Sequence, residues 1–173
     1  VRALAISPDG KNVYGVSYDS NSIVHWDRDS TGTLTNQVSK IDSVNLYSAM
    51  SVAISSDGKN VYAVAEGAVA DDSYIVHWDR SSTGALTNQV NLPIVVIPMS
   101  VTVSPDGKNV YVVTHDGSMI HWVRNLNTGA LTSQVNAAAD NQYYSSVIVS
   151  PDNQNVYAVA GMSPDSTPNS KSI

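Results

Sequence analysis

His115 and a small set of carboxylates are the residues of this chain whose types and spacing best suit chemistry. Glu66, the only glutamate, is followed by Asp71 and Asp72, and Asp116 directly follows His115. An imidazole near carboxylates can act as a general acid and base on a lactone, and carboxylate oxygens can bind a cation. These five residues are therefore our candidate ligand-binding residues. The plainer alternative is that acidic loop residues are simply solvated.

The other three histidines recur at one position, directly before a tryptophan: His25, His77 and His121. Zinc holds its ligands at about 2 Å, whereas packed β-sheets stand about 10 Å apart. Equivalent positions on neighbouring repeat units therefore cannot share one metal ion. We expect these histidines to be packed or edge-exposed repeat residues, and we expect no metal and no cofactor.

Aromatic residues also recur in the units, and we interpret them as structural core of the repeat. For the tryptophans, a lectin-like aromatic site on each unit is the alternative. The recurring aromatic residues are Trp26, Trp78, Trp122, Tyr14, Tyr62 and Tyr111.

These positions belong to a repeat whose fullest form reads Ser-Pro-Asp-Gly-Lys-Asn-Val-Tyr, a variable gap, Ile-Val-His-Trp-Asp-Arg, and Thr-Gly-x-Leu-Thr-Asn-Gln-Val. Its aspartates Asp9, Asp57, Asp106 and Asp152 follow one another at intervals of 48, 49 and 46 residues. The fourth copy is incomplete. Periods of this length, filled with short strand signals, indicate a radial or stacked repeat architecture.

Each unit contains four short segments rich in β-branched residues, and none has a helical period with caps. The first segment ends at Ser-Pro-Asp-Gly, where proline presets φ and glycine supplies positive φ for a tight turn. In the first unit the segments are 1–6, 13–16, 23–27 and 33–38. Four antiparallel strands in about 48 residues are typical of a propeller blade. The fold class predicted is all-β, a β-propeller with about 3.5 four-stranded blades in this chain.

The repeated turns and the variable loops should lie on opposite faces of such a propeller. The turns after the first and third strands share one rim, and we expect Arg28, Arg80 and Arg124 to flank them there. The remaining connections share the other face, and they differ from unit to unit. Binding residues concentrate on loops carried by a rigid scaffold. The variable connections are 18–22, 39–49, 65–74, 91–98, 114–118, 136–145 and 161–171.

Composition excludes several classes of function. A net charge of −6 argues against a nucleic-acid partner, which would require a basic stripe. No apolar run approaches the roughly 20 residues of a membrane-spanning helix. Cysteine is absent, which excludes disulfides and thiolate metal sites. Few charges with much Ser, Thr, Asn and Gln favour a secreted or cell-surface protein, with a cytoplasmic location as the alternative.

The repeat resembles the lactonase-like seven-bladed propellers, the family of bacterial 6-phosphogluconolactonase and its YVTN-type relatives. The similarity rests on Ser-Pro-Asp-Gly-Lys-Asn-Val-Tyr-Val-Val-Thr, the strand that ends near Asp-Arg, and Thr-Gly-Ala-Leu-Thr. These motifs specify the blade rather than an activity. One departure is His-Trp, where the family has an apolar residue and then Phe. The resemblance implies a lactone-processing enzyme whose relatives use His, Arg and Glu on the loop face.

We therefore expect one propeller segment over residues 1–173, with blades at 1–49, 50–98 and 99–145 and an incomplete fourth at 146–173. A ring of seven or eight blades requires more than this. Either the chain is a fragment, which we favour, or two copies share one ring. The expected partners are accordingly a homodimer mate or the remainder of the propeller.

Three functions stay open at this point. The first is a module that binds a small molecule, a carbohydrate or a protein through its variable loop face. The second, implied by the resemblance, is hydrolysis of a lactone. The third is a purely structural repeat in a larger surface protein.

Overall fold

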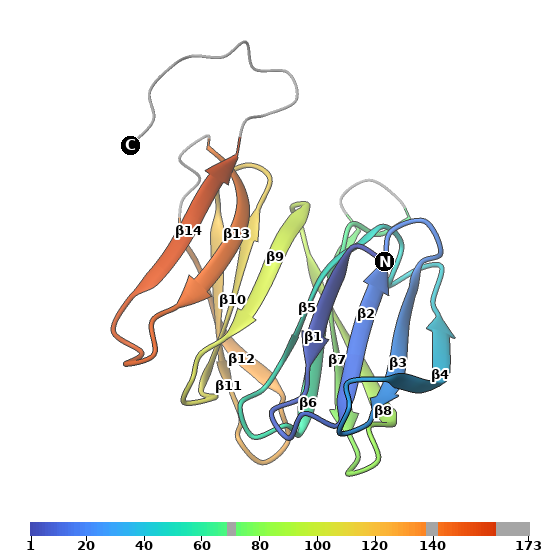
Figure 1. The fold of residues 1–173 in the computed structure, drawn as a ribbon. Helices are drawn as coiled ribbons and strands as arrows, with labels where there is room; N and C mark the ends of the chain where they lie inside the picture. Colours follow the sequence, from blue (N-terminus) through green and yellow to red (C-terminus); the bar gives the residue numbers. More distant parts are fainter. Residues whose placement is uncertain (69–71, 138–141, 162–173) are drawn as a thin grey trace.

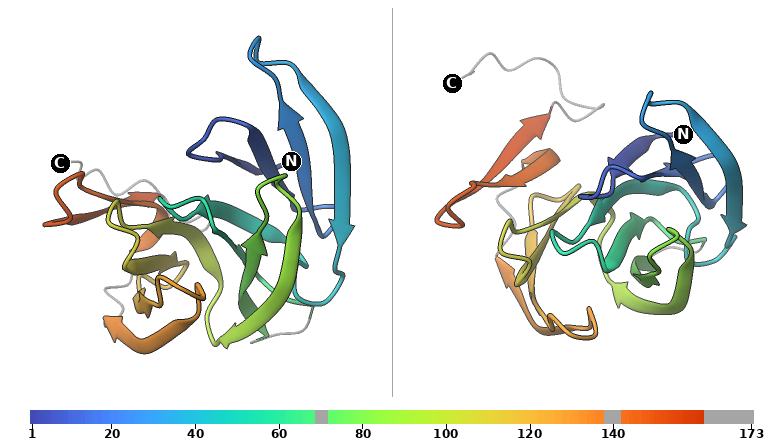
Figure 2. Two further views of the ribbon diagram at one scale, coloured as in Figure 1. Left: turned by 90° about the horizontal axis from the view of Figure 1, so that it is seen from below. Right: turned by 60° about the horizontal axis from the view of Figure 1, so that its bottom comes forward.

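The computed structural model describes residues 1–68, 72–137 and 142–161. Three antiparallel sheets have four strands each, in chain order from the first strand to the fourth, and a further sheet has two. The sheets stand around a common axis as an open arc of propeller blades, with neighbouring first strands in contact (Figures 1 and 2). The predicted all-β propeller is confirmed, and the chain is part of one. No helix long and apolar enough to cross a membrane occurs in the described part.

The strands of each blade have these bounds. Blade 1 contains β1 (Ala3–Ile6), β2 (Asn12–Ser17), β3 (Ser22–Arg28) and β4 (Leu34–Ile41). Blade 2 contains β5 (Ala49–Ile54), β6 (Asn60–Ala65), β7 (Ser73–Arg80) and β8 (Leu86–Ile94). Blade 3 contains β9 (Pro98–Val103), β10 (Asn109–Thr114), β11 (Met119–Arg124) and β12 (Leu131–Ala137), and blade 4 contains β13 (Tyr143–Val149) and β14 (Val156–Gly161).

The repeated hairpin between the first and second strands is built by its own side chains. In blade 2 the Ser55 hydroxyl donates to Asp57 Oδ1 (2.6 Å) and accepts from the Asn60 amide (3.0 Å). Gly58 closes the turn with φ of 70°, a conformation that costs glycine nothing. The motif recurs in every blade because it satisfies the turn's polar groups locally. Blade 4 places Asn153 (φ 61°) where the others have glycine.

Two opposite faces of each blade form the core between blades. We call the face that carries Tyr14 and its equivalents the Tyr face, and the face that carries Trp26 and its equivalents the Trp face. The Tyr face of one blade packs on the Trp face of the next, so that Tyr14, Val16 and Ile23 meet Val61, Val76 and Trp78. Tyr62, Val64 and Ile75 meet Val110, Ile120 and Trp122 in the same way.

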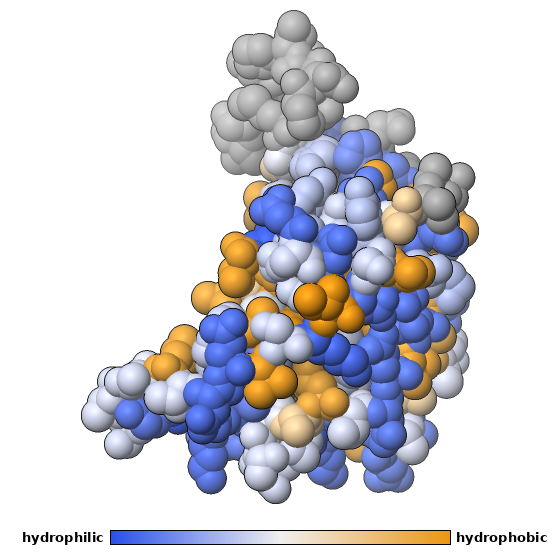
Figure 3. Space-filling view, turned by 90° about the vertical axis from the view of Figure 1, so that its right-hand side faces the viewer, coloured by the Kyte–Doolittle hydropathy of each residue, from blue (hydrophilic) through white to orange (hydrophobic). Residues whose placement is uncertain are grey.

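Position in the arc decides how deeply the repeated tryptophans are buried. Trp78 and Trp122 are 0% and 2% exposed, whereas Trp26 on the outer face of blade 1 is only half-buried. Apolar side chains on the fourth strands are also exposed, among them Val38 and Ile41 of β4. On the side of the molecule that carries β4, Figure 3 shows apolar side chains scattered among polar ones. A register shift after His25, and again after His77 and His121, places Asn36, Asn88 and Ser133 at positive φ in these strands.

An arginine joins each pair of adjacent complete blades at the hairpin rim. Arg80 donates to the Gly58 carbonyl of its own blade (3.0 Å) and reaches across to the Asp9 carboxylate (3.0 Å) and to Asn12 of blade 1. Its Nε also donates to the Tyr14 hydroxyl (3.0 Å). We call this set the arginine latch. The expectation that the arginines flank the turns is met, and the latch adds a contact between blades that the repeat spacing could not reveal.

The second latch repeats the first. Arg124 donates to the Gly107 carbonyl (3.0 Å), the Asp57 carboxylate (3.0 Å), the Tyr62 hydroxyl (2.9 Å) and Asn60. Each tyrosine hydroxyl in turn donates to a glycine carbonyl of the next blade: Tyr14 to Gly84 (2.6 Å) and Tyr62 to Gly129 (2.7 Å). The hairpin rim is thus the structural side of the molecule.

Candidate ligand-binding site on the loop face

A cavity of about 510 Å³ opens on the variable loop face between blades 2 and 3. Four connections line it, those between β4 and β5, β6 and β7, β8 and β9, and β10 and β11. Its polar side chains include Glu66, Ser73, His115 and Asp116, and its apolar wall is formed by Tyr47, Val95, Val96 and Ile97. The structure therefore brings together three of the five predicted site residues, Glu66, His115 and Asp116.

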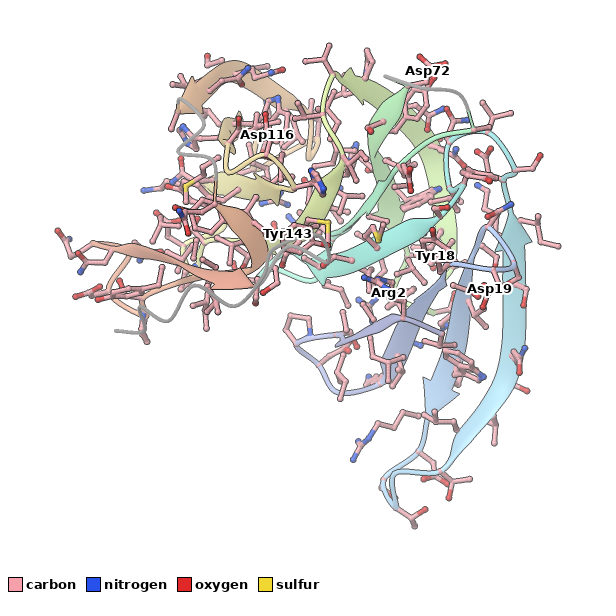
Figure 4. The ribbon with its side chains drawn as sticks, turned by 90° about the horizontal axis from the view of Figure 1, so that it is seen from above. Arg2, Tyr18, Asp19, Asp72, Asp116 and Tyr143 are labelled. Atoms are coloured by element: carbon pink, nitrogen blue, oxygen red, sulfur yellow. The ribbon has the colours of Figure 1, made fainter. Side chains whose placement is uncertain are left out.

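The other two predicted residues stand apart from this arrangement. Asp71 lies outside the described residues. Asp72 is half-buried and does not line the cavity, and Figure 4 shows it at the outer edge of the loop face, away from Asp116. The Asp72 carbonyl instead lies against Gly67, whose φ of 83° and missing side chain allow the two backbone segments to meet.

The backbone around Glu66 is fixed by neighbouring connections. The Ser73 hydroxyl donates to the Glu66 carbonyl (2.9 Å), and the Gly67 amide donates to the Tyr47 carbonyl (3.3 Å). The Glu66 side chain is half-buried at the cavity wall. These bonds hold the start of a long loop in place, so the carboxylate is presented from a fixed backbone.

His115 and Asp116 lie in the tight turn between β10 and β11 and have different roles. Asp116 Oδ1 accepts from the Thr114 hydroxyl (2.6 Å) and from the Ser118 amide (3.0 Å). Burial alone would raise the pKa of this carboxyl, but those bonds outweigh it and lower the pKa below its usual range. Asp116 is therefore committed largely to its turn.

The His115 ring is the exposed, chemically available group of this turn. Its amide is anchored by the Ile97 carbonyl (2.9 Å), and its ring meets the Tyr143 ring edge to face at 5.1 Å. The imidazole is thus oriented by an aromatic neighbour from blade 4. That contact positions a side chain that can donate, accept or transfer a proton at the cavity edge.

A second cavity of about 460 Å³ lies at the axis, between the first strands of the four blades. Arg2, Met50, Met99 and Tyr143 line it, and Figure 4 shows Arg2 and Tyr143 near the centre of the loop face. The Tyr143 hydroxyl reaches Met99 Sδ at 3.8 Å within this second cavity, and the Tyr143 ring contacts His115, which lines the first cavity.

Sequence reasoning missed Arg2 as a functional candidate, although a signal was present. Aligning the repeats places Arg2 where the next units have Met50, Met99 and Ser145, so it is the one cation among four equivalent positions. Its guanidinium lies over the Tyr18 ring at 5.6 Å, a cation–π contact that holds it at the loop face.

The repeated histidines play no part in either cavity lining. His25, His77 and His121 stack on Tyr14, Tyr62 and Tyr111 with ring centroids 5.2, 5.1 and 4.9 Å apart. Each also contacts the asparagine of its own hairpin through Nε2, at 2.9, 3.0 and 2.8 Å. Burial lowers the pKa of His25 and of His77.

No group of three His, Cys, Asp or Glu side chains suited to a metal ion occurs among the described residues.

The sequence of this chain matches the model of a known protein family. Residues 2–147 match the sequence model described as lactonase, 7-bladed beta-propeller. A search of curated proteins gave no match.

Several solved structures share the fold. A proposed 6-phosphogluconolactonase of Bacteroides fragilis is 22% identical with a TM-score of 0.69, over 80% of this chain and 39% of the other. A proposed 6-phosphogluconolactonase of Bacteroides uniformis is 16% identical with a TM-score of 0.69, over 92% and 47%. The hydrazine synthase of Kuenenia stuttgartiensis is 17% identical with a TM-score of 0.66, over 94% and 42%. This chain therefore spans less than half the length of each.

Proposed function

Because the chain belongs to the lactonase family of seven-bladed β-propellers, we propose that it binds a small, uncharged, hydroxyl-rich molecule in the loop-face cavity between blades 2 and 3. A sugar or a sugar lactone is the chemical class that fits. The observation that carries the proposal is that Glu66 and His115 line one cavity together with the apolar side chains of Val95, Val96 and Ile97.

The composition of the cavity supports this ligand class. Small-molecule sites typically combine an apolar wall with a few convergent polar groups. The Glu66 carboxylate can accept hydrogen bonds from hydroxyl groups, His115 can donate or accept, and the Tyr47 ring offers a surface for the C–H face of a sugar. The described lining contains Glu66 and Asp116 but no Lys or Arg. A phosphorylated sugar would meet negative charge there, which favours a neutral ligand.

Hydrolysis of a lactone is the second candidate, favoured by the family match and by the exposed imidazole of His115. In this reaction His115 would take a proton from a water molecule as that water adds to the lactone carbonyl carbon. The ring C–O bond then breaks, and the proton passes from the imidazolium to the departing alkoxide. The product is the open hydroxy acid, and the histidine ends neutral.

Titration calorimetry on the 173-residue chain tests binding with D-glucose, D-glucono-1,5-lactone and glucose 6-phosphate as probes. We expect the two neutral compounds to bind more tightly than the phosphate. Glu66→Gln should weaken their binding by about ten-fold or more, because a hydrogen bond to a charged acceptor contributes about 1.5–3 kcal/mol. Asp19→Asn, on the same face beside a different cavity, is the matched control and should bind like the parent. Equal loss in both variants, or tighter binding of the phosphate, would refute the assignment.

A pH-stat assay with D-glucono-1,5-lactone separates binding from catalysis. If the chain is a hydrolase, ring opening exceeds the buffer rate and His115→Ala removes about 10²–10⁴-fold of that gain. Saturable binding without any rate above buffer would leave the binding module as the function. Neither binding nor turnover would leave the structural role.

A further inference from the structure

Two equivalent grooves lie between neighbouring complete blades, along the edge strands β4, β8 and β12 that follow one another around the outside of the arc (Figure 2). The first outer groove, of about 330 Å³, separates blades 1 and 2, and the second outer groove, of about 310 Å³, separates blades 2 and 3. Each is bounded by the third and fourth strands of one blade and by the Thr-Gly turn of the next. Both walls of each groove therefore belong to blades that this chain carries in full.

The two grooves present the same residue types at seven equivalent positions and differ clearly at one. The first has Lys40 where the second has Leu92, and Ile23 lines the first groove only. The shared positions in the first groove are His25, Asp27, Asn36, Val38, Thr83, Ala85 and Leu86. The shared positions in the second groove are His77, Asp79, Asn88, Val90, Thr128, Ala130 and Leu131.

The Asp79 carboxylate is fixed in the second outer groove and remains accessible. Its Oδ1 accepts from Asn60 (3.0 Å) and its Oδ2 from Asn88 (2.8 Å), while the side chain stays 42% exposed. Asn88 has φ of 50° at the register shift between β7 and β8. Blade 3 makes the same shift with Val123 and Ser133 at these two positions. The blade therefore forms without the Asp–Asn pair, and the fold does not account for its presence.

No positive charge in the described lining of the second outer groove balances Asp79, because no lysine or arginine lines it. His77 Nε2 lies 3.8 Å from Asp79 Oδ1, but burial lowers the pKa of His77, so the imidazole is neutral at pH 7. Arg124 bonds to Asn60, yet its guanidinium is paired with the Asp57 carboxylate in the arginine latch. The groove thus presents a carboxylate whose charge is open to a ligand.

Apolar side chains lie in the same groove as this carboxylate. Val90 is 47% exposed, and Leu92 and Leu131 are packed on the core with part of their surface open. In the first outer groove Lys40 is half-buried, and its ammonium lies 6.0 Å from the centre of the Trp78 ring. The first groove therefore contains its own cation, and the second has apolar surface at that position.

We propose that the second outer groove binds a small organic cation, an apolar body that carries a protonated amine. The ammonium donates to the Asp79 carboxylate, and the apolar body covers Val90, Leu92 and Leu131. Such a ligand matches a groove that combines an apolar wall with one fixed, charged acceptor. Lys40 excludes the same ligand from the first outer groove by like-charge repulsion. This inference is independent of the sugar site proposed for the loop face.

An amide NMR titration of the whole chain with hexylammonium tests the two grooves separately, because each has its own reporters. The amides of Ala130 and Leu131 report on the second outer groove, those of Ala85 and Leu86 report on the first, and that of Glu66 reports on the loop-face cavity. In the parent we expect shifts at Ala130 and Leu131 only. Hexanol has the same apolar body without the charge, and it should bind about ten-fold or more weakly.

Exchanging the residue that differs between the grooves should move the site. Lys40→Leu should add shifts at the first-groove amides, and Leu92→Lys should remove the shifts at the second-groove amides. Asp79→Asn should weaken binding by about ten-fold or more, because the charged acceptor is lost. Asp27→Asn, the same change at the equivalent position of blade 1, is the matched control and should bind like the parent. The same spectra show whether each variant is folded.

Unmoved second-groove amides at millimolar hexylammonium would overturn the proposal, as would equal shifts in both grooves of the parent. A folded Lys40→Leu chain whose first-groove amides stay unmoved would also contradict it. Hexanol binding as tightly as hexylammonium would show that the Asp79 charge is not what selects the ligand.

Discussion

At the scale of single residues, equivalent positions of the repeat should contribute differently to the free energy of unfolding, because they pack against different neighbours. Trp78 and Trp26 occupy the same place in their blades, yet Trp78 is fully buried against blade 1 and Trp26 is half-buried on an open face. Both indoles donate to a glutamine on the adjacent fourth strand, at 3.1 and 3.2 Å. The chemistry of the residue is therefore constant, and only the packing changes.

Replacing each tryptophan by alanine should show how much stability depends on the burial of the side chain, because the residue type is the same at both positions. Trp78→Ala should cost about 3–5 kcal/mol of unfolding free energy, because a fully buried aromatic side chain leaves a cavity. Trp26→Ala should cost clearly less. Urea denaturation of the two variants measures the difference. Equal losses would show that the packing of blade 1 on blade 2 does not determine the stability of the repeat.

At the scale of elements, the Thr-Gly glycines of blades 2 and 3, Gly84 and Gly129, lie where each blade meets the hairpin of the previous blade. A Cβ at Gly84 would lie 2.5 Å from Asn12 Nδ2 and 2.4 Å from His25 Nε2. At Gly32 the nearest atom would be Arg28 Nη2, 3.7 Å away. Both glycines have positive φ, 87° and 91°, so a substitution adds the same backbone strain in each.

Gly84→Ala should therefore destabilise the chain more than Gly32→Ala. We expect about 1–2 kcal/mol from the left-handed conformation in both variants. At Gly84 a further loss of about 1–3 kcal/mol follows, because Asn12 must leave its part-buried hydrogen bonds to Asp27 and Arg80. Chemical denaturation with linear extrapolation gives both values. A Gly32→Ala variant as unstable as Gly84→Ala would contradict the described interface.

The elements were predictable from the sequence and the contacts between them were not. Ser-Pro-Asp-Gly and Thr-Gly are local signals, so the strands and the hairpin rim followed from turn chemistry and period. The Arg80–Asp9 pair joins residues 71 positions apart, and no local pattern encodes it. The same holds for the loop face. Glu66 and His115 could be identified from the sequence because they depart from the repeat. Tyr143 and the apolar residues Val95–Ile97 could be identified only from the folded structure. Arg2 departed from the repeat too, and its significance depended on knowing that the first strands surround the axis.

At the scale of the whole molecule, the carboxylates of the arginine latch should make the free energy of unfolding depend on pH. A hydrogen bond from Ser7, with further bonds from the Lys11 amide and Arg80, lowers the pKa of Asp9 to about 2. Bonds from Ser55, Lys59 and Arg124 outweigh burial and lower the pKa of Asp57. A carboxyl whose pKa is depressed by folding adds stability that is complete above its unfolded pKa of about 4 and lost as the pH falls through the folded value.

The free energy of unfolding should therefore fall between about pH 4 and pH 2 as these carboxylates protonate. Asp9→Asn should flatten that part of the profile, because the ionised partner of Arg80 is already gone. Asp19→Asn, which lies outside the latch, should leave it unchanged. Tryptophan fluorescence in urea at each pH reports the transition. An Asp9→Asn profile that parallels the parent in this window would show that the latch does not account for it.

The molecule divides into a hairpin rim that holds the blades together and a loop face for which we propose ligand binding. Hydrogen–deuterium exchange with and without D-glucono-1,5-lactone, read by mass spectrometry on the intact chain, tests that division most directly. We predict slower exchange at Glu66–Ala68 and His115–Ser118, with the Ser7–Asn12 and Ser55–Asn60 hairpins unchanged. Protection confined to the hairpins, or no protection at any lactone concentration, would contradict it.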